Sequence, residues 1–171
     1  MAQITRSMYH QDLQPSYRIG QFLTWMARRQ WGLRIMHRFM MQPMVGNQID
    51  GMVNEEIYIP SVATPGHQIR ARVYKPANAQ GPLPAMLYAH GGGYQVGVPE
   101  QANPFFQDLL NRRDVAIVAP AYRLSLQGLP YPDGLNDCFD TLCYIKANAP
   151  DLGIRSDKFI VAGHSGGGGM A

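Results

Sequence analysis

Residues 159–167 read Phe-Ile-Val-Ala-Gly-His-Ser-Gly-Gly, and this stretch decides the fold. It begins with an apolar run typical of a buried strand and continues with the pattern G-x-S-x-G around Ser165. In that pattern a strand turns sharply into a helix, so that the serine hydroxyl projects from the chain. The start of the helix adds its positive dipole end at the same point. Ser165 is therefore a candidate nucleophile.

A second motif, His-Gly-Gly-Gly-Tyr at residues 90–94, also follows an apolar run, at residues 85–89. Glycines carry no Cβ and tolerate positive φ, so their backbone N–H groups can point at a substrate oxygen from close by. Such donors stabilise the negative charge that develops on a carbonyl oxygen. A nucleophile together with an anion-binding loop indicates acyl-transfer chemistry.

The N-terminal part of the chain predicts helices followed by a hairpin. Residues 16–45 show an apolar stripe at helical spacing and predict one or two helices. From residue 53 the period changes to two, and residues 56–59 and 69–74 predict a half-exposed hairpin around a turn at 64–67. We place the boundary between a helical arm and a sheet domain at residues 46–52.

The rest of the chain alternates between apolar strands and amphipathic helices. The predicted buried strands are residues 85–89, 115–119 and 159–162, and the predicted helices are residues 104–113 and 133–149. The second helix is expected to bury one face, formed by Leu135, Phe139, Leu142 and Ile145. A hairpin followed by such alternation indicates an α/β fold with parallel central strands.

These motifs together resemble the α/β-hydrolase superfamily, and specifically the hormone-sensitive-lipase-like esterases. The resemblance also rests on a helical N-terminal cap and on residues beyond the two glycine motifs, namely Tyr122-Arg123-Leu124, Tyr131-Pro132 and Asp137. Two features depart from the family pattern. His164 and Gly166 stand where the family commonly has Asp and Ala, and residues 125–127 read Ser-Leu-Gln rather than Ala-Pro-Glu.

The resemblance implies an incomplete α/β-hydrolase sheet. Residues 1–50 would form a helical cap arm, and residues 51–171 the N-terminal part of the hydrolase domain, which stops just after the nucleophile turn. In the family the triad Asp and His follow the serine, so both are expected to be missing from this chain. We therefore expect the isolated chain to be inactive.

The resemblance also implies a role for each residue of the site. Ser165 would attack a small-molecule carboxylic ester and form an acyl-enzyme, with no cofactor and no metal. The N–H groups of Gly92, Gly93 and Gly166 would form the oxyanion hole, and His90 and Gly91 would support the glycine loop.

The other histidines have plainer interpretations. His10 and His37 lie in the arm, and His67 lies in the hairpin turn. His164 adjoins Ser165 at a sharp turn, where neighbouring side chains point in different directions, so we expect it not to reach that serine. No pair of histidines has a metal-binding spacing such as H-E-x-x-H.

Three alternatives to the esterase interpretation stay open. The first is a non-catalytic, truncated hydrolase fragment. The second is a membrane-surface module, because the arm combines arginines with Trp25 and Trp31 and could make a weak contact with anionic lipid. The third is a dinucleotide-binding domain, since residues 166–171 formally fit part of that glycine fingerprint. Its confirming acidic residue would lie beyond Ala171.

Composition limits the class of protein. The 171 residues are 46% hydrophobic, which is typical of one globular domain rather than a disordered chain. Residues 1–50 carry six arginines against two aspartates, whereas residues 51–171 carry nine basic and ten acidic side chains. This local excess does not predict nucleic-acid binding. The sequence has no membrane-spanning run and no signal peptide, so we expect a cytoplasmic protein. Cys138 and Cys143 are expected not to meet.

Overall fold

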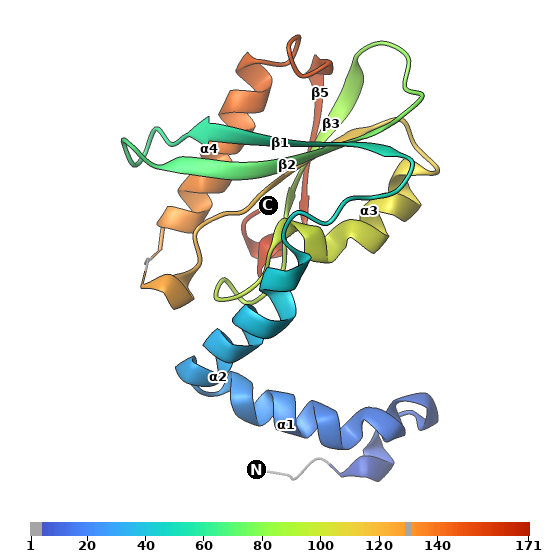
Figure 1. Cartoon of the computed structure of the whole chain (residues 1–171), viewed down its shortest axis with the longest axis vertical. Coiled ribbons are helices and arrows are strands. Elements are labelled where there is room, and N and C mark those ends of the chain that lie inside the picture. Colours follow the sequence, from blue (N-terminus) through green and yellow to red (C-terminus); the bar gives the residue numbers. More distant parts are fainter. Residues whose placement is uncertain (1–4, 129–130) are drawn as a thin grey trace.

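The computed structural model describes residues 5–128 and 131–171. Within these residues a five-stranded sheet has the order β1–β2–β4–β3–β5 (Figure 1). β3 runs parallel to β4 and β5, whereas β2 is antiparallel to β1 and β4. The predicted fold class, a hairpin followed by parallel strands, is confirmed. The strands are β1 (Met52–Pro60), β2 (Gln68–Pro76), β3 (Leu83–Ala89), β4 (Ala116–Pro120) and β5 (Ile154–Gly163).

Helices α3 (Asn103–Leu110) and α4 (Asp133–Ala147) contribute to two separate hydrophobic clusters. Phe106 and Leu110 of α3 belong to one cluster, and Cys138 and Ile145 of α4 belong to the other. Successive strand residues point to opposite faces of a sheet, so neighbours on one strand enter different clusters. This division is seen at Val73 and Tyr74, Met86 and Leu87, and Ile117 and Val118.

The predicted half-exposed hairpin is correct for only one of its strands. Almost all residues of β1 are exposed or partly exposed, but most residues of β2 are buried. β2 pairs with β1 on one side and with β4 on the other, so it is an internal strand. The alternating sequence pattern does not reveal this second neighbour.

The prediction that residues 159–162 are buried is wrong. β5 is the last strand of the sheet, and Ile160 and Val161 are 57% and 39% exposed. An apolar run indicates a strand, but it does not show which faces and edges the neighbouring elements cover.

The predicted buried face of α4 is also wrong in part. Ile145 is buried as expected, but Phe139 is 62% exposed. Asp137, Cys138 and Thr141 are buried instead. Asp137 forms an ion pair with Arg123, so this side of the helix faces inward. On the same side, the small side chain of Cys138 packs against residues of the sheet. The two cysteines do not meet, since Cys138 is buried and Cys143 is exposed, and both are free thiols.

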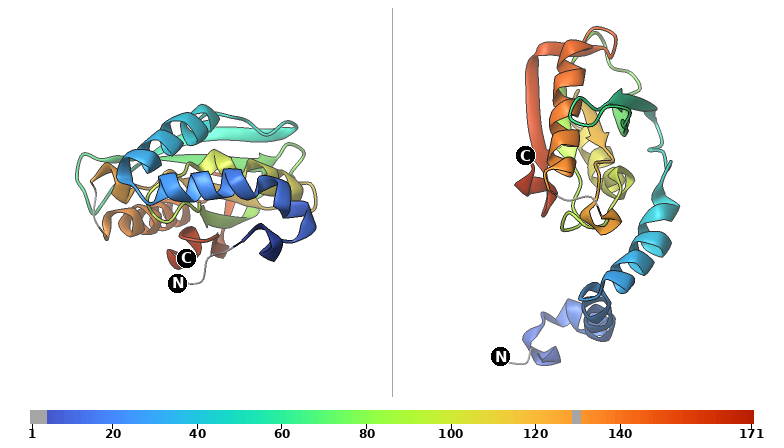
Figure 2. Two further views of the ribbon diagram at one scale, coloured as in Figure 1. Left: turned by 90° about the horizontal axis from the view of Figure 1, so that it is seen from below. Right: turned by 90° about the vertical axis from the view of Figure 1, so that its left-hand side faces the viewer.

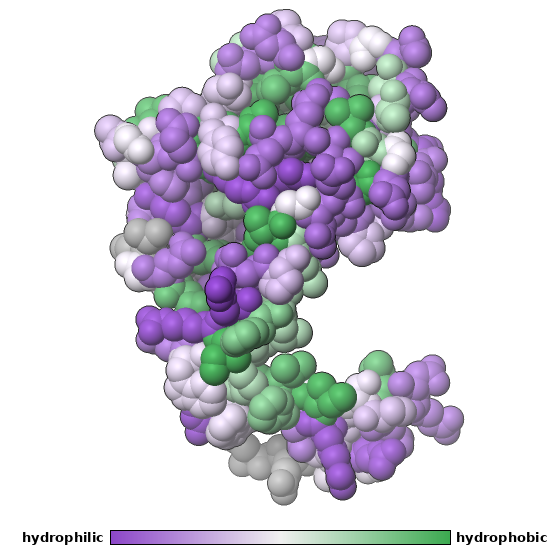
Figure 3. All heavy atoms as spheres, viewed as in Figure 1, coloured by the Kyte–Doolittle hydropathy of each residue, from purple (hydrophilic) through white to green (hydrophobic). Residues whose placement is uncertain are grey.

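The N-terminal arm extends away from the sheet (Figures 1 and 2). It consists of α1 (Tyr17–Ala27), α2 (Gln30–Met36), a π-helical turn (His37–Met41) and a 3₁₀ turn (Gln42–Met44). Its apolar side chains gather beside a hollow between the arm and the sheet (Figure 3). No helix in the described ranges is long and apolar enough to cross a membrane. Further 3₁₀ turns are Arg6–Met8, Gln11–Ser16, Pro99–Ala102, Ser125–Gln127 and Gly167–Gly169.

Candidate active site

Ser165 lies in a strained turn at the end of β5. Its φ of 53° falls in the left-handed region, which is unusual for a residue with a side chain. The Gly167 N–H donates to the His164 carbonyl at 2.9 Å, and the Gly168 N–H donates to the Ser165 carbonyl at 3.0 Å, so the turn leads into a short 3₁₀ segment. Ser165 is exposed, while Gly166 and Gly167 behind it are buried. This arrangement has the features of a nucleophile elbow.

The glycine loop after β3 has an unusual backbone at three consecutive residues. Gly92, Gly93 and Tyr94 have φ values of 131°, 60° and 64°. The Gln95 and Val96 N–H groups both donate to the Gly92 carbonyl at 3.1 Å, which closes the loop. Glycine suits the first two positions because residues with a Cβ seldom adopt such angles.

The structure brings the glycine loop and the serine turn together. A Cβ atom on Gly166 would lie 3.1 Å from the backbone nitrogens of Gly93 and Tyr94. A Cβ on Gly91 would lie 2.5 Å from the His164 ring. The glycine loop therefore contacts the serine turn through Gly91 and Gly93, and the serine turn contacts the loop through Gly166. Gly92 forms the bend between Gly91 and Gly93.

His90 lies beneath the loop. Its side chain is buried, and its ring stacks on Tyr122 with the centroids 4.2 Å apart. Burial lowers the pKa of His90 to about 4, so the ring is neutral near pH 7. Its Nδ1 lies 2.8 Å from the Gly91 carbonyl, and because a carbonyl only accepts, Nδ1 carries the proton. The Tyr122 hydroxyl donates to the His90 carbonyl at 2.7 Å.

Gln101 is a supporting residue that the sequence analysis did not identify. Its Nε2 donates to the Gly91 carbonyl at 3.0 Å, and its Oε1 accepts from the Val98 N–H at 3.4 Å. The Gly91 carbonyl therefore accepts two hydrogen bonds, one from His90 and one from Gln101. No motif signals this contact, because Gln101 follows the loop in an unremarkable polar segment.

The His164 ring contacts Tyr88 and Gly91. Its Nδ1 lies 2.7 Å from the Tyr88 hydroxyl, and its other side faces Gly91. Tyr88 belongs to β3, so this pair ties the serine turn to the strand that precedes the glycine loop. The sharp turn predicted that His164 does not reach Ser165, but no feature of the sequence indicated the partner Tyr88.

Arg123 and Asp137, which the sequence analysis associated with the family, form a buried ion pair. Arg123 Nη2 donates to Asp137 Oδ1 at 2.8 Å, and the Arg123 N–H donates to Asp137 Oδ2 at the same distance. The hydrogen bond to the Asp137 carboxylate, with the negative charges of Asp137, Asp133 and Asp140, holds the pKa of Arg123 above its usual value. Arg123 Nη1 also donates to Thr64 in the hairpin turn at 3.0 Å. This network fixes the chain after β4 against α4.

Hydrogen bonds join the arm to the segment after the glycine loop. His37 Nδ1 accepts from the Gly97 N–H at 3.3 Å, and the Gly46 N–H donates to Glu100 Oε1 at 2.9 Å. Glu100 is buried and also pairs with Arg70. Across residues 5–128 and 131–171, no three or more His, Cys, Asp or Glu side chains gather to hold a metal ion.

Comparison with known proteins identifies relatives of this chain. The family described as "alpha/beta hydrolase fold" matches residues 86–171. Carboxylesterase NlhH of Mycobacterium tuberculosis is 33% identical over 103 residues, which cover 60% of this chain and 32% of that protein. Ethyl acetate hydrolase of Pseudomonas putida is 33% identical over 108 residues, which cover 62% of this chain and 34% of that protein.

Solved structures give the same relationship. A structure described as bacterial heroin esterase has a TM-score of 0.70 and 29% identity, covering 86% of this chain and 45% of that one. The chain spans about a third of the length of the curated relatives named above. The match covers half of the chain and includes both glycine motifs, and these relatives are esterases. The chain therefore belongs to the alpha/beta hydrolase fold family.

Proposed function

We propose that Ser165 is the nucleophile of a carboxylic-ester hydrolase. The observation that carries this proposal is the close approach of Gly166 to the Gly93 and Tyr94 nitrogens, beside a serine held at positive φ. A serine hydroxyl next to backbone N–H donors is the arrangement that acyl transfer needs.

The proposed reaction has two steps. Ser165 Oγ attacks the ester carbonyl carbon, and the Gly92, Gly93 and Gly166 N–H groups stabilise the negative oxygen that forms. The C–O bond to the alcohol then breaks, the alcohol leaves with a proton, and the acyl group remains on Ser165. Water attacks this acyl-enzyme, releases the carboxylic acid and restores the serine hydroxyl.

His90 and Gly91 act in this proposal as supports of the oxyanion loop. A neutral, buried His90 that donates to the Gly91 carbonyl suits a structural role. It is poorly placed as a general base, because its ring is buried beneath the loop and stacked on Tyr122. The Gln101 contact to the same carbonyl adds a second support.

We further propose that the base and the acid that serve Ser165 lie outside these 171 residues. Each of the five histidines contacts a residue other than Ser165. His90 and His164 are engaged as described above. His37 binds Gly97, His67 Nε2 lies 3.8 Å from Asp137, and His10 lies beside Asp12 in the arm. Reading the gene downstream of the Ala171 codon for an in-frame Asp and His tests this point.

The test of the nucleophile is hydrolysis of p-nitrophenyl acetate by the gene product that contains this chain. We expect Ser165→Ala to lower kcat by on the order of 10⁴-fold or more. Ser156→Ala, an exposed serine on β5, is the matched control and should leave the rate unchanged. Retention by the Ser165→Ala variant of a tenth of the parent rate would contradict the assignment.

A further inference from the structure

His164 lies between the two motifs that the proposed reaction needs. It directly precedes Ser165, and its ring lies against Gly91 of the glycine loop. A Cβ on Gly91 would be 2.5 Å from His164 Nε2, 2.9 Å from Cδ2 and 3.0 Å from Cε1. These ring atoms therefore occupy the side of Gly91 on which other residues carry a side chain. Gly91 cannot move toward the serine turn without meeting this ring.

Tyr88 holds the His164 ring on its Nδ1 side. The Tyr88 hydroxyl lies 2.7 Å from His164 Nδ1. Tyr88 is buried, and its ring packs on Phe105 and Phe106 with the centroids 5.6 and 4.9 Å apart. Burial also raises the pKa of Tyr88, so its hydroxyl stays protonated near neutral pH. Tyr88 is thus a fixed neighbour that restricts the His164 ring to one place.

The peptide bond between Gly91 and Gly92 determines where one proposed oxyanion donor points. Its carbonyl, on Gly91, accepts hydrogen bonds from His90 Nδ1 at 2.8 Å and from Gln101 Nε2 at 3.0 Å. A trans peptide bond is planar, with its C=O and N–H groups pointing in opposite directions. The position of the Gly91 carbonyl therefore sets the direction of the Gly92 N–H.

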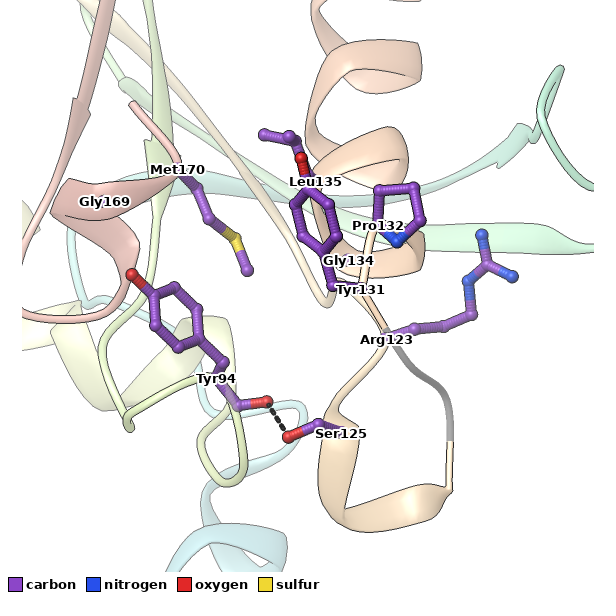
Figure 4. A pocket seen from close by; sticks show the side chains of 9 residues that line it. All are labelled: Tyr94, Arg123, Ser125, Tyr131, Pro132, Gly134, Leu135, Gly169 and Met170. Atoms are coloured by element: carbon purple, nitrogen blue, oxygen red, sulfur yellow. Dashed lines mark hydrogen bonds between the residues drawn. The ribbon is translucent and has the colours of Figure 1, made fainter.

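The far end of the glycine loop has attachments of its own. The Tyr94 carbonyl accepts from the Ser125 N–H at 2.9 Å and from Ser125 Oγ at 3.2 Å, the bond drawn in Figure 4. A methyl group on Gly169 would collide with the Tyr94 hydroxyl, which lies beside that glycine in the same view. These contacts hold the loop at Tyr94, whereas His164 acts at Gly91, three residues earlier.

We propose that His164 is a positioning residue, which Tyr88 holds against Gly91 so that the Gly92 N–H stays directed at the developing negative oxygen. The proposal rests on the proposed function, and it gives His164 no proton to transfer. An aspartate, the residue that the family commonly has at this position, has no ring with which to fill the space beside Gly91. The departure of this chain from the family pattern therefore has a structural consequence.

The effect of His164 on the loop can be tested without turnover. The order parameter S² of the Gly92 amide is measured by ¹⁵N relaxation in the gene product that contains this chain and carries Ser165→Ala. We expect about 0.85, typical of rigid backbone, and a value below about 0.6 after His164→Ala. Gly153, which also has a positive φ but lies in the turn before β5, is the internal reference and should not change. An unchanged Gly92 value would overturn the proposal.

Turnover gives the second measurement. An oxyanion donor acts on the charge of the transition state, so its displacement lowers kcat and leaves KM nearly unchanged. With p-nitrophenyl acetate, we expect His164→Ala to lower kcat about 10- to 100-fold, less than the roughly 100- to 1,000-fold effect of removing such a donor. Tyr88→Phe removes only the hydrogen bond and should lower kcat about two- to tenfold. Tyr58→Phe, at an exposed tyrosine whose hydroxyl donates to Glu56, is the matched control and should keep the parent rate.

A double variant and a conservative replacement test whether the two residues act as a unit. Tyr88→Phe should have no further effect on kcat when His164→Ala is already present. His164→Phe keeps a ring beside Gly91, so it should restore kcat to the level of Tyr88→Phe. Multiplied effects of Tyr88→Phe and His164→Ala, or equal losses of kcat in His164→Phe and His164→Ala, would contradict the proposal.

These outcomes are distinguishable from a failure of the proposed function. If hydrolysis survives Ser165→Ala, the proposed function is wrong, while the Gly92 order parameter still decides whether His164 holds the loop. A loss of kcat in His164→Ala with an unchanged Gly92 amide would show that His164 acts by another route, and would overturn the proposal. If His164→Ala does not fold, Tyr88→Phe, which keeps the ring packing, decides through the same two measurements.

Discussion

His37 Nδ1 accepts a hydrogen bond from the Gly97 N–H at 3.3 Å, which joins the arm to the segment that closes the glycine loop. Gly97 packs directly beneath that loop, since a Cβ on it would lie 2.5 Å from the Gly91 carbonyl oxygen and 2.6 Å from His90 Nδ1. Burial lowers the pKa of His37, which favours the neutral ring that can accept this bond. The arm is therefore physically linked to the proposed oxyanion loop.

This link predicts a difference between two His37 variants. His37→Leu removes the acceptor, and we expect the Gly97 amide to exchange with solvent about two- to tenfold faster, the effect of one lost hydrogen bond. His37→Asn places an oxygen near the position of Nδ1 and should keep the parent rate. Hydrogen exchange followed by NMR measures both, and equal acceleration in the two variants would show that the bond does not hold the loop.

The glycines after Ser165 predict a sharp contrast in stability. A methyl group on Gly167 would collide with the carbonyl oxygens of Ala89 and His90, whereas a methyl on Gly168 meets its nearest atom at 3.4 Å, an ordinary contact. We expect Gly167→Ala to lower the unfolding free energy by about 1–3 kcal/mol through overpacking. Gly168→Ala should be neutral or slightly stabilising. Urea titration compares them, and similar midpoints for both variants would contradict this packing.

His90 predicts a loss of stability in mild acid. Its pKa is about 4 in the folded chain and 6.5 ordinarily. Between these values the unfolded state binds more protons, so the unfolding free energy decreases as the pH falls through this window. The decrease reaches about 1.4 kcal/mol per pH unit for one group. NMR titration of the His90 ring checks the cause. A His90 signal that titrates near 6.5 would contradict it.

Tryptophan fluorescence reports on the arm, because both tryptophans of the sequence, Trp25 and Trp31, lie in it. Their rings are 5.7 Å apart and about half exposed, and Phe22 stacks on Trp25. We retain the interpretation of the arm as a cap, whose apolar side chains gather beside the hollow in Figure 3. Emission should then stay unchanged when vesicles with anionic lipid are added at about 0.15 M salt. A blue shift with anionic but not neutral vesicles would favour the membrane alternative.

The sequence predicted the elements that depend on local pattern. The three apolar runs became β3, β4 and β5, and the glycines around Ser165 predicted the sharp turn seen there. The local sequence pattern did not predict which strands pair with one another. The burial of β2 depends on β4, which lies more than 40 residues later, and the exposure of β5 depends on its place at the edge.

The site was predictable to a similar degree. Gly91, Gly93 and Gly166 could be selected because glycine motifs have a conformational reason that is visible in the sequence. The contacts made by Gln101, Tyr88 and His37 could not, since they join ordinary residues from separate segments. The face of α4 was misjudged because the hydrophobic pattern does not reveal that Asp137 is buried in an ion pair with Arg123.

The central claim is that Ser165 forms a covalent acyl-enzyme, and trapping that species tests it most directly. The gene product that contains this chain is mixed with p-nitrophenyl hexanoate, quenched in acid within the first turnover, digested and analysed by mass spectrometry. We predict a hexanoyl group on the peptide that carries Ser165, and none on that peptide in the Ser165→Ala variant. Turnover with the hexanoyl group on a different residue, or with no covalent intermediate in a quench fast enough to capture one, would contradict the account.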